Sequence, residues 1–84
     1  MLRVRFFATI REQLGRASLE LPFAVACARV EGLIEWLDTT GLPGCGAALR
    51  APNTLVAVNQ VVAGREAALA DGDEVAFYPP VTGG

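Results

Sequence analysis

The hydrophobic and polar positions alternate at the start of the chain. Leu2, Val4 and Phe6 are separated by arginines, and a period of two is typical of a strand with one buried face. The alternation places Phe7, a large aromatic residue, on the polar side. The pattern of residues 2–7 therefore predicts a strand with an aromatic ring on its solvent-exposed face.

The next segments predict a return of the chain along this strand. Residues 9–15, "TIREQLG", are expected to form a loop or short turn. In "ASLELP", Leu19 and Leu21 fall on one face and predict a second short strand. We expect the two strands to form a hairpin.

The middle of the chain changes to a helical period. Apolar residues recur there at i, i+3, i+4 and i+7: Val30, Leu33, Ile34 and Leu37. This spacing predicts a helix that ends at Gly41 and Pro43. It lacks a Ser or Thr N-cap, and Gly32 within it suggests a close approach to the sheet.

The second half predicts further strands. Residues 44–50, "GCGAALR", suit a short second helix, and residues 54–62, "TLVAVNQVV", are apolar on both faces and predict an interior strand. After a tight "DGD" turn, residues 74–78 predict a final strand with Tyr78 facing away from Phe77. The order of elements predicts an α+β fold, one sheet with a helix across one face.

Composition narrows the function. The chain has 84 residues, a net charge of −2 and no histidine, which suits one domain and disfavours binding to nucleic acid or catalysis by a histidine base. Cys27 and Cys45 are too far apart for a C-x-x-C pair, so no metal site is predicted. Cys27 lies in an apolar run and is expected to be buried. With no leader peptide or membrane span predicted, we expect a cytoplasmic protein.

The chain ends in "PPVTGG", and this segment is the candidate site. Pro79, Pro80, Val81 and Thr82 favour extended backbone, and a segment of about six residues reaches at most about 20 Å. We expect an extended, flexible tail over residues 79–84 that carries the carboxylate of Gly84 into another protein. A frayed end or an expression scar is the alternative interpretation of the glycine pair.

A tail that becomes ordered in a partner needs other contacts to offset the lost entropy. Phe7 and Tyr78 fall on faces opposite the predicted core residues, and Val62 is near a predicted buried strand in the sequence. We expect these side chains to form an apolar docking patch. The alternative is that the rings pack beneath a loop or a second layer.

The sequence resembles a known family at both ends and in its third-strand region. "DGDEVAFYPPVTGG", "VNQ" and "RVRFFATIREQLG" are similar to the small subunit of molybdopterin synthase, the MoaD-type sulfur carriers. The resemblance implies a ubiquitin-like β-grasp fold with a mixed sheet of four to five strands over residues 1–78. The double proline favours this carrier over those of thiamine or cysteine biosynthesis.

The resemblance also implies a mechanism. An E1-like enzyme, which holds ATP and Mg²⁺, would adenylate Gly84, and a persulfide donor would convert it to a thiocarboxylate. The large synthase subunit would accept the tail, and the sulfur would attack cyclic pyranopterin monophosphate to build the molybdopterin dithiolene. The chain would then be no enzyme on its own, hold no permanent cofactor, and assemble into a heterotetramer.

Carried over to this chain, the resemblance makes Gly84 the sulfur-bearing residue. Gly83, which has no side chain, would let the end of the tail pass through a narrow channel. Phe7, Val62 and Tyr78 would form the docking surface, with Pro79 to Thr82 following the partner's cleft. Three other classes stay open: a carrier for another pathway, a ubiquitin-like protein modifier, and a binding module with a flexible end.

Overall fold

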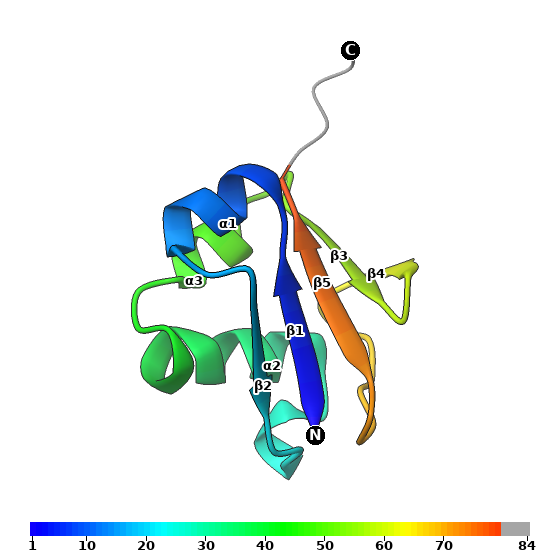
Figure 1. Cartoon of the computed structure of the whole chain (residues 1–84). Helices are drawn as coiled ribbons and strands as arrows, with labels where there is room; N and C mark the ends of the chain where they lie inside the picture. Colours follow the sequence, from blue (N-terminus) through cyan, green and yellow to red (C-terminus); the bar gives the residue numbers. More distant parts are fainter. Residues whose placement is uncertain (80–84) are drawn as a thin grey trace.

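The first and last strands of the chain lie side by side in the middle of one sheet. The computed structural model describes residues 1–79, in which β1 (Leu2–Phe6) pairs in parallel with β5 (Glu74–Tyr78). The other pairs are antiparallel: β2 (Ser18–Leu21) with β1, β3 (Leu55–Val58) with β5, and β4 (Val61–Ala63) with β3. Within these residues the sheet has five strands in the order β2-β1-β5-β3-β4 (Figure 1). The mixed sheet predicted from the sequence is confirmed.

Helical segments pack against one face of this sheet (Figure 1). They are α1 (Ala8–Leu14), the 3₁₀ turn η1 (Val25–Cys27), α2 (Val30–Trp36), the π-helical turn η2 (Leu37–Gly41) and α3 (Gly46–Leu49). Their apolar residues form one cluster with the inward side chains of the strands. The members that are almost fully inaccessible include Leu2, Val4, Phe6, Leu33, Ile34, Leu37, Val75 and Phe77. The α+β arrangement and the helix beginning at Val30 are thereby confirmed.

The segment predicted as a loop after β1 is a helix, α1, so that prediction was wrong. The carbonyl of Phe7 accepts hydrogen bonds from the amides of Ile10 and Arg11, and Ile10 is buried. Gly15 ends the helix at φ 70, with its N–H donated to Arg11. Strands β1 and β2 pair antiparallel as expected, but a helix connects them in place of a tight turn.

Residues 54–62 do not form one strand, which corrects a second prediction. β3 and β4 are joined by a turn at Asn59 and Gln60, whose φ angles are 50 and 70, the backbone of a tight hairpin turn. The side chain of Asn59 holds the turn against β5: its Nδ2 donates to Asp73 at 3.0 Å, and its Oδ1 accepts from the Glu74 amide at 3.0 Å. The hairpin puts β3 inside the sheet, as predicted, and β4 at its edge.

Helix α2 begins without a side-chain cap because another segment supplies the acceptors. The amides of Val30 and Glu31 donate to the carbonyls of Ala67 and Arg65 at 3.0 and 2.8 Å, which satisfies two of the free donors at a helix start. Gly32 is close to the preceding turn, not to the sheet as expected. A Cβ there would lie 2.2 Å from the carbonyl oxygen of Ala26.

Candidate functional site

Two aromatic rings stack on the face of the sheet that the helices leave open. The amide of Phe7 donates to the carbonyl of Phe77 at 3.2 Å, which continues the β1–β5 pairing by one residue and sets Phe7 beside Tyr78. Their ring centroids are 4.7 Å apart and the planes differ by 4°. Both side chains are half-buried. The structure thus brings together two of the residues that the sequence predicted as a docking surface.

Small and aliphatic residues extend this aromatic pair across the open face. Leu55 lies opposite Tyr78 in the β3–β5 register, and Val62 lies opposite Ala57 on the edge strand. Leu55 is 41% exposed and Val62 is 72% exposed, whereas Ala57 is buried between them. We call the following residues the open-face patch: Phe7, Leu55, Ala57, Val62, Ala76 and Tyr78.

Val62 belongs to this patch but does not contact the aromatic pair in register. It lies on the row of Ala76 and Ala57, while Phe7 lies with Tyr78 and Leu55 on the next row. Leu55, Ala57 and Ala76 were not among the predicted site residues. The signal for them was present, because a strand that is apolar on both faces places one apolar row on the open face when helices cover only the other.

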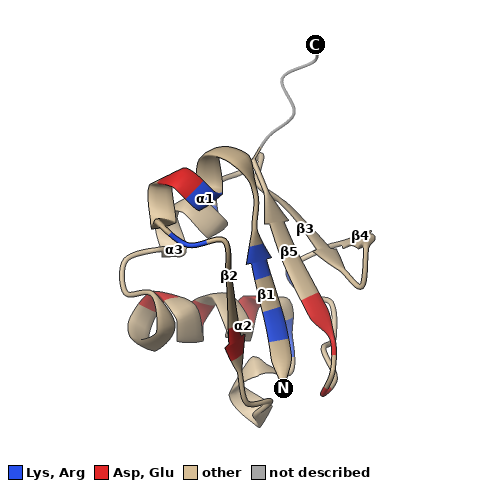
Figure 2. Ribbon diagram, in the orientation of Figure 1, with Lys and Arg blue, Asp and Glu red and all other residues tan. Residues whose placement is uncertain are grey.

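Charged residues border this patch on the open face. Arg3 and Arg5 follow each other on one side of β1, and Arg5 Nη1 lies 3.9 Å from Glu74 Oε2. Figure 2 shows basic residues along β1 and acidic residues on β5 and α2. Asp73 directly precedes β5. Its pKa is lowered, because its carboxylate accepts hydrogen bonds from the Asn59 side-chain amide and the backbone amide of Ala70.

The acidic side chains of α2 are occupied by an arginine of the following segment. Arg50 Nε lies 2.9 Å from Glu31 and its Nη2 lies 2.8 Å from Glu35. A third contact, of 3.6 Å, joins Arg50 Nη1 to Asp38. These hydrogen bonds raise the pKa of Arg50. The cluster connects α2 to the segment after α3, so we assign it to the fold and not to the site.

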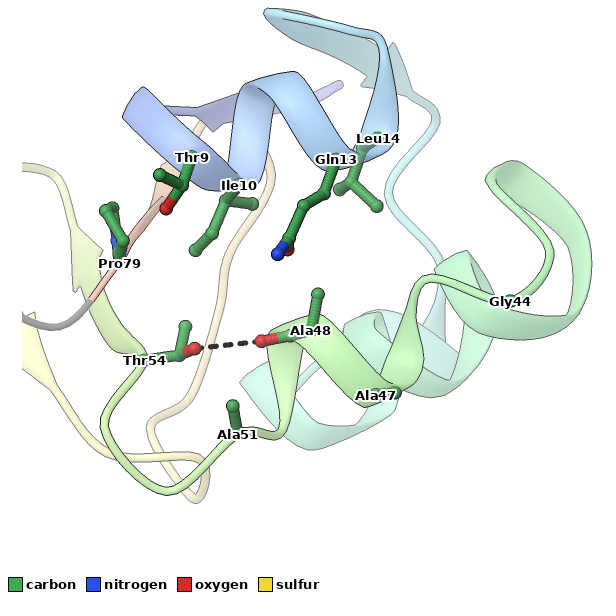
Figure 3. Close-up of a pocket in the computed structure, with 10 residues that line it drawn as sticks. All are labelled: Thr9, Ile10, Gln13, Leu14, Gly44, Ala47, Ala48, Ala51, Thr54 and Pro79. Carbon is green, nitrogen blue, oxygen red and sulfur yellow. Dashed lines mark hydrogen bonds between the residues drawn. The ribbon is translucent and has the colours of Figure 1, made fainter.

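Pro79, the residue that follows β5, lines a cleft of about 510 Å³ between α1 and α3. Figure 3 shows Ile10 and Gln13 of α1 facing Ala48, with Pro79 at one side. Thr54 Oγ1 closes the floor by donating to the Ala48 carbonyl at 2.8 Å. Of the described residues, those lining the cleft include no ionisable side chain.

Pro79 is the last described residue of the predicted tail. It directly follows Tyr78, so any segment beyond it starts next to the open-face patch. The predicted site residues Pro80, Val81, Thr82, Gly83 and Gly84 lie outside the described residues. Their roles, and the division of the chain after residue 78, stay predictions.

Both cysteines are buried among apolar residues. Cys27 is part of the core cluster, as predicted, and so is Cys45. Burial raises the pKa of both thiols, and Asp38 raises that of Cys45 further. Neither thiol is therefore set up as a nucleophile at neutral pH.

Within residues 1–79 the structure offers neither a metal site nor a membrane-spanning helix. No group of three or more metal-ligating side chains occurs within residues 1–79. The helices of the same region are all too short or too polar to cross a membrane.

The sheet order, the helix across one face and the open apolar face define a ubiquitin-like β-grasp protein. The ThiS family matches the chain over residues 4–84, so the chain belongs to the ThiS family. Two relatives are similar over the whole length of both chains. The molybdopterin synthase sulfur carrier subunit of Haemophilus influenzae is 44% identical, and that of Escherichia coli is 40% identical.

Solved structures agree with this fold. SAMP1 from Haloferax volcanii superimposes with a TM-score of 0.81 at 25% identity, covering 99% of this chain and 98% of that one. A structure of the BexX/CysO complex from Amycolatopsis orientalis gives a TM-score of 0.79 at 26% identity, with complete coverage of both chains. The β-grasp fold that the sequence resemblance implied is confirmed.

Proposed function

We propose that this protein is the sulfur carrier subunit of a molybdopterin synthase. One observation carries the proposal: two sulfur carrier subunits of that synthase match the chain from end to end at 40–44% identity. The open-face patch supports the proposal because it lies next to Pro79, where the C-terminal segment begins. A carrier must bind other proteins close to its reactive end. The chain has no histidine, so in this proposal the partners supply the acid and base groups.

In the proposed first step, Gly84 is activated as the terminal residue. A carboxylate is a poor electrophile because its charge repels nucleophiles. An E1-like enzyme, which holds ATP and Mg²⁺, joins the Gly84 carboxylate to AMP and releases pyrophosphate. The mixed anhydride that results has a good leaving group. Gly83 adds no side chain beside this carbonyl, so both residues fit a narrow active site.

Sulfur then replaces AMP. The terminal sulfur of a persulfide attacks the Gly84 carbonyl, AMP leaves, and an acyl disulfide remains. A thiol attacks the donor-side sulfur of that disulfide, becomes oxidised to a new disulfide, and releases the thiocarboxylate. The thiocarboxylate sulfur is anionic at neutral pH and nucleophilic. This thiol and the persulfide donor are external to the chain, whose own cysteines are buried.

The loaded carrier then delivers its sulfur to cyclic pyranopterin monophosphate in the large subunit. The sulfur forms a C–S bond to a carbon of the pterin side chain as a C–O bond of that carbon breaks, and the oxygen leaves as water or remains on the phosphate. Water then hydrolyses the resulting thioester, which leaves the sulfur on the pterin and returns the Gly84 carboxylate. Two such transfers supply the two sulfurs of the dithiolene. Docking of the open-face patch would place Pro79 at the partner surface and direct residues 80–84 toward its active site. The proposal places these steps in the cytoplasm and the two subunits in a heterotetramer.

The test is the intact mass of the chain after incubation with the E1-like enzyme, ATP and a persulfide donor. The mass should rise by the difference between a sulfur and an oxygen atom. A variant that lacks Gly84 should keep its mass and its melting temperature, because the core cluster is built from residues of the part of the chain that the structure describes, which ends at Pro79. An unchanged mass of the wild-type chain would refute the proposal. Loading of the truncated variant would refute the role of Gly84.

A ubiquitin-like modifier is the second candidate, favoured by the likeness to SAMP1, a small archaeal modifier protein. Such a protein would form isopeptide bonds between Gly84 and lysines of other proteins. A ladder of conjugates in the same incubation, with lysate added, would favour it. A carrier for thiamine or cysteine biosynthesis would load sulfur equally well but would not support dithiolene formation with the large synthase subunit.

A further inference from the structure

Arg5 lies at the rim of the aromatic pair on the open face. Its guanidinium carbon is 5.2 Å from the centre of the Phe7 ring, within the range of a cation–π contact, and Phe7 in turn stacks on Tyr78. Arg5 also faces Ala76 in the β1–β5 register. A protein surface that covers the aromatic pair must therefore also cover the Arg5 guanidinium.

The charge of Arg5 is poorly compensated. Its ionic contact within residues 1–79 is with Glu74, at 3.9 Å, which is longer than a hydrogen bond. Arg50 provides a contrast in the same molecule, since two carboxylates accept hydrogen bonds from it at 2.8 and 2.9 Å. The side chain of Arg5 is 48% exposed, so water now satisfies most of its donors.

Docking on the open-face patch would remove that water. A guanidinium that loses its water without gaining an acceptor is strongly unfavourable, whereas a carboxylate can satisfy it through two parallel hydrogen bonds. We propose that the docking partner carries an aspartate or glutamate that pairs with Arg5, and that Arg5 thereby determines which partners this carrier accepts. The inference rests on the proposed function, because it assumes that a partner covers this patch.

Arg3 is the matched control. It lies two residues earlier on the same strand and on the same face, but it borders a polar hollow with Asn59, Gln60 and Glu74. It is exposed and lies farther from the aromatic pair along the strand. Arg3 and Arg5 therefore share charge and strand but differ in whether a ligand on the patch would cover them.

The experiment measures binding of the molybdopterin synthase large subunit from the same organism to the wild-type chain and to its variants. Arg5→Met should raise Kd about 30-fold or more, mainly through faster dissociation. Arg3→Met should change Kd by less than about fivefold. Arg5→Lys should recover part of the affinity because it restores the charge.

The sign of the salt effect separates charge pairing from simple support of the Phe7 ring. Added salt should weaken wild-type binding and strengthen binding of Arg5→Glu, because in the variant it screens a repulsion between two carboxylates. A ring-support role would make Arg5→Glu and Arg5→Met equally weak and equally insensitive to salt, and that result would overturn the inference.

Equal affinities of wild type, Arg5→Met and Arg5→Glu would also overturn the inference while leaving the proposed function intact. A wild-type chain that does not bind the large subunit, although it loads sulfur, would instead overturn its assignment to this synthase and the inference with it. A melting temperature measured for each variant confirms that the binding changes do not arise from unfolding.

Discussion

The molecule contains two stacked aromatic pairs that differ by a single step along the same two strands. Phe6 and Phe77 lie on the covered face, fully buried, with ring centroids 6.0 Å apart. Phe7 and Tyr78 lie on the open face, half-buried, with centroids 4.7 Å apart. Successive side chains in a strand point to opposite faces, so adjacent residues enter different environments.

This difference teaches that the environment of a ring, and not its presence, decides what the ring does. The covered pair removes its surface from water when the chain folds, and its stabilising effect is complete in the free protein. The open pair keeps part of its surface in water until a second protein covers it. A stacked aromatic pair therefore contributes to folding on one face and is available for binding on the other.

The largest expected effect is on the covered pair. Phe77→Ala should lower the free energy of unfolding by about 3–5 kcal/mol, through lost burial and a cavity in the core cluster. Urea denaturation monitored by circular dichroism measures this change. Phe77→Leu is the control and should cost less than about 1.5 kcal/mol, because it keeps most of the volume. A loss below 1 kcal/mol for the alanine variant would contradict the assignment of Phe77 to the core.

The open pair should show the opposite balance between stability and binding. Phe7→Ala and Tyr78→Ala should each lower the free energy of unfolding by about 1 kcal/mol, as expected for a half-exposed stacked ring. Each should weaken binding of the large subunit by about 30-fold, the effect of a central interface aromatic. If Phe7→Ala instead loses 3 kcal/mol or more of stability, Phe7 belongs to the core.

Two exposed valines, one on the open face and one outside it, allow the same comparison with a smaller expected effect on binding. Val62 is 72% exposed on the open face, and Val25 is 90% exposed in η1. Val62→Asp should weaken binding of the large subunit by about tenfold, because an unpaired carboxylate would be desolvated. Val25→Asp should leave the affinity unchanged, and both variants should melt like the wild type. Equal loss of affinity in the two variants would show that net charge, and not the patch, controls binding.

The smallest effect concerns the turn that closes the charged end of the open face. Gln60 has a φ of 70, which a glycine adopts without the steric cost of a side chain, so Gln60→Gly should raise the free energy of unfolding by about 1 kcal/mol. Asn59→Gly is the contrasting variant, because it also removes the hydrogen bonds to Asp73 and Glu74. It should therefore lose stability. Calorimetry compares the two, and the same sign for both would refute this account of the turn.

The sequence predicted those parts of the fold in which one residue pattern dominates. Alternation in residues 2–7 and 74–78 gave both central strands and put Phe7 and Tyr78 on the open face. The spacing of Val30, Leu33 and Ile34 gave α2. In each case a buried face requires apolar residues at a fixed period, so the pattern and the structure have the same cause.

The errors arose where local signals were weak or concealed by composition. Ile10 and Leu14 have helical spacing before Gly15, but the segment is short and polar and was interpreted as a loop. In residues 54–62 the apolar run concealed a turn at Asn59 and Gln60, because glutamine rarely adopts a positive φ. The missing cap of α2 is supplied by carbonyls more than thirty residues away, which no local pattern reveals.

The candidate site was predictable only in part for a similar reason. Phe7 and Tyr78 are large aromatic residues at positions that the alternation of their strands assigns to the open face, so each can be recognised from its own segment. Leu55, Ala57 and Ala76 join them only through strand register, and Arg5 becomes notable only when its loose contact with Glu74 is seen. Which residues share a face across three strands depends on pairing that the sequence alone does not show.

The central claim, that the open face binds partners and the covered face holds the fold, has one direct test. Hydrogen–deuterium exchange of this chain should be compared with and without the large subunit of molybdopterin synthase. We predict that the large subunit slows exchange of the amides at the C-terminal ends of β1 and β5, where Phe7 and Tyr78 lie, and in the edge strand β4. Exchange in α2 should not change. Protection concentrated on α2 and α3, with the β4 edge unchanged, would contradict the account.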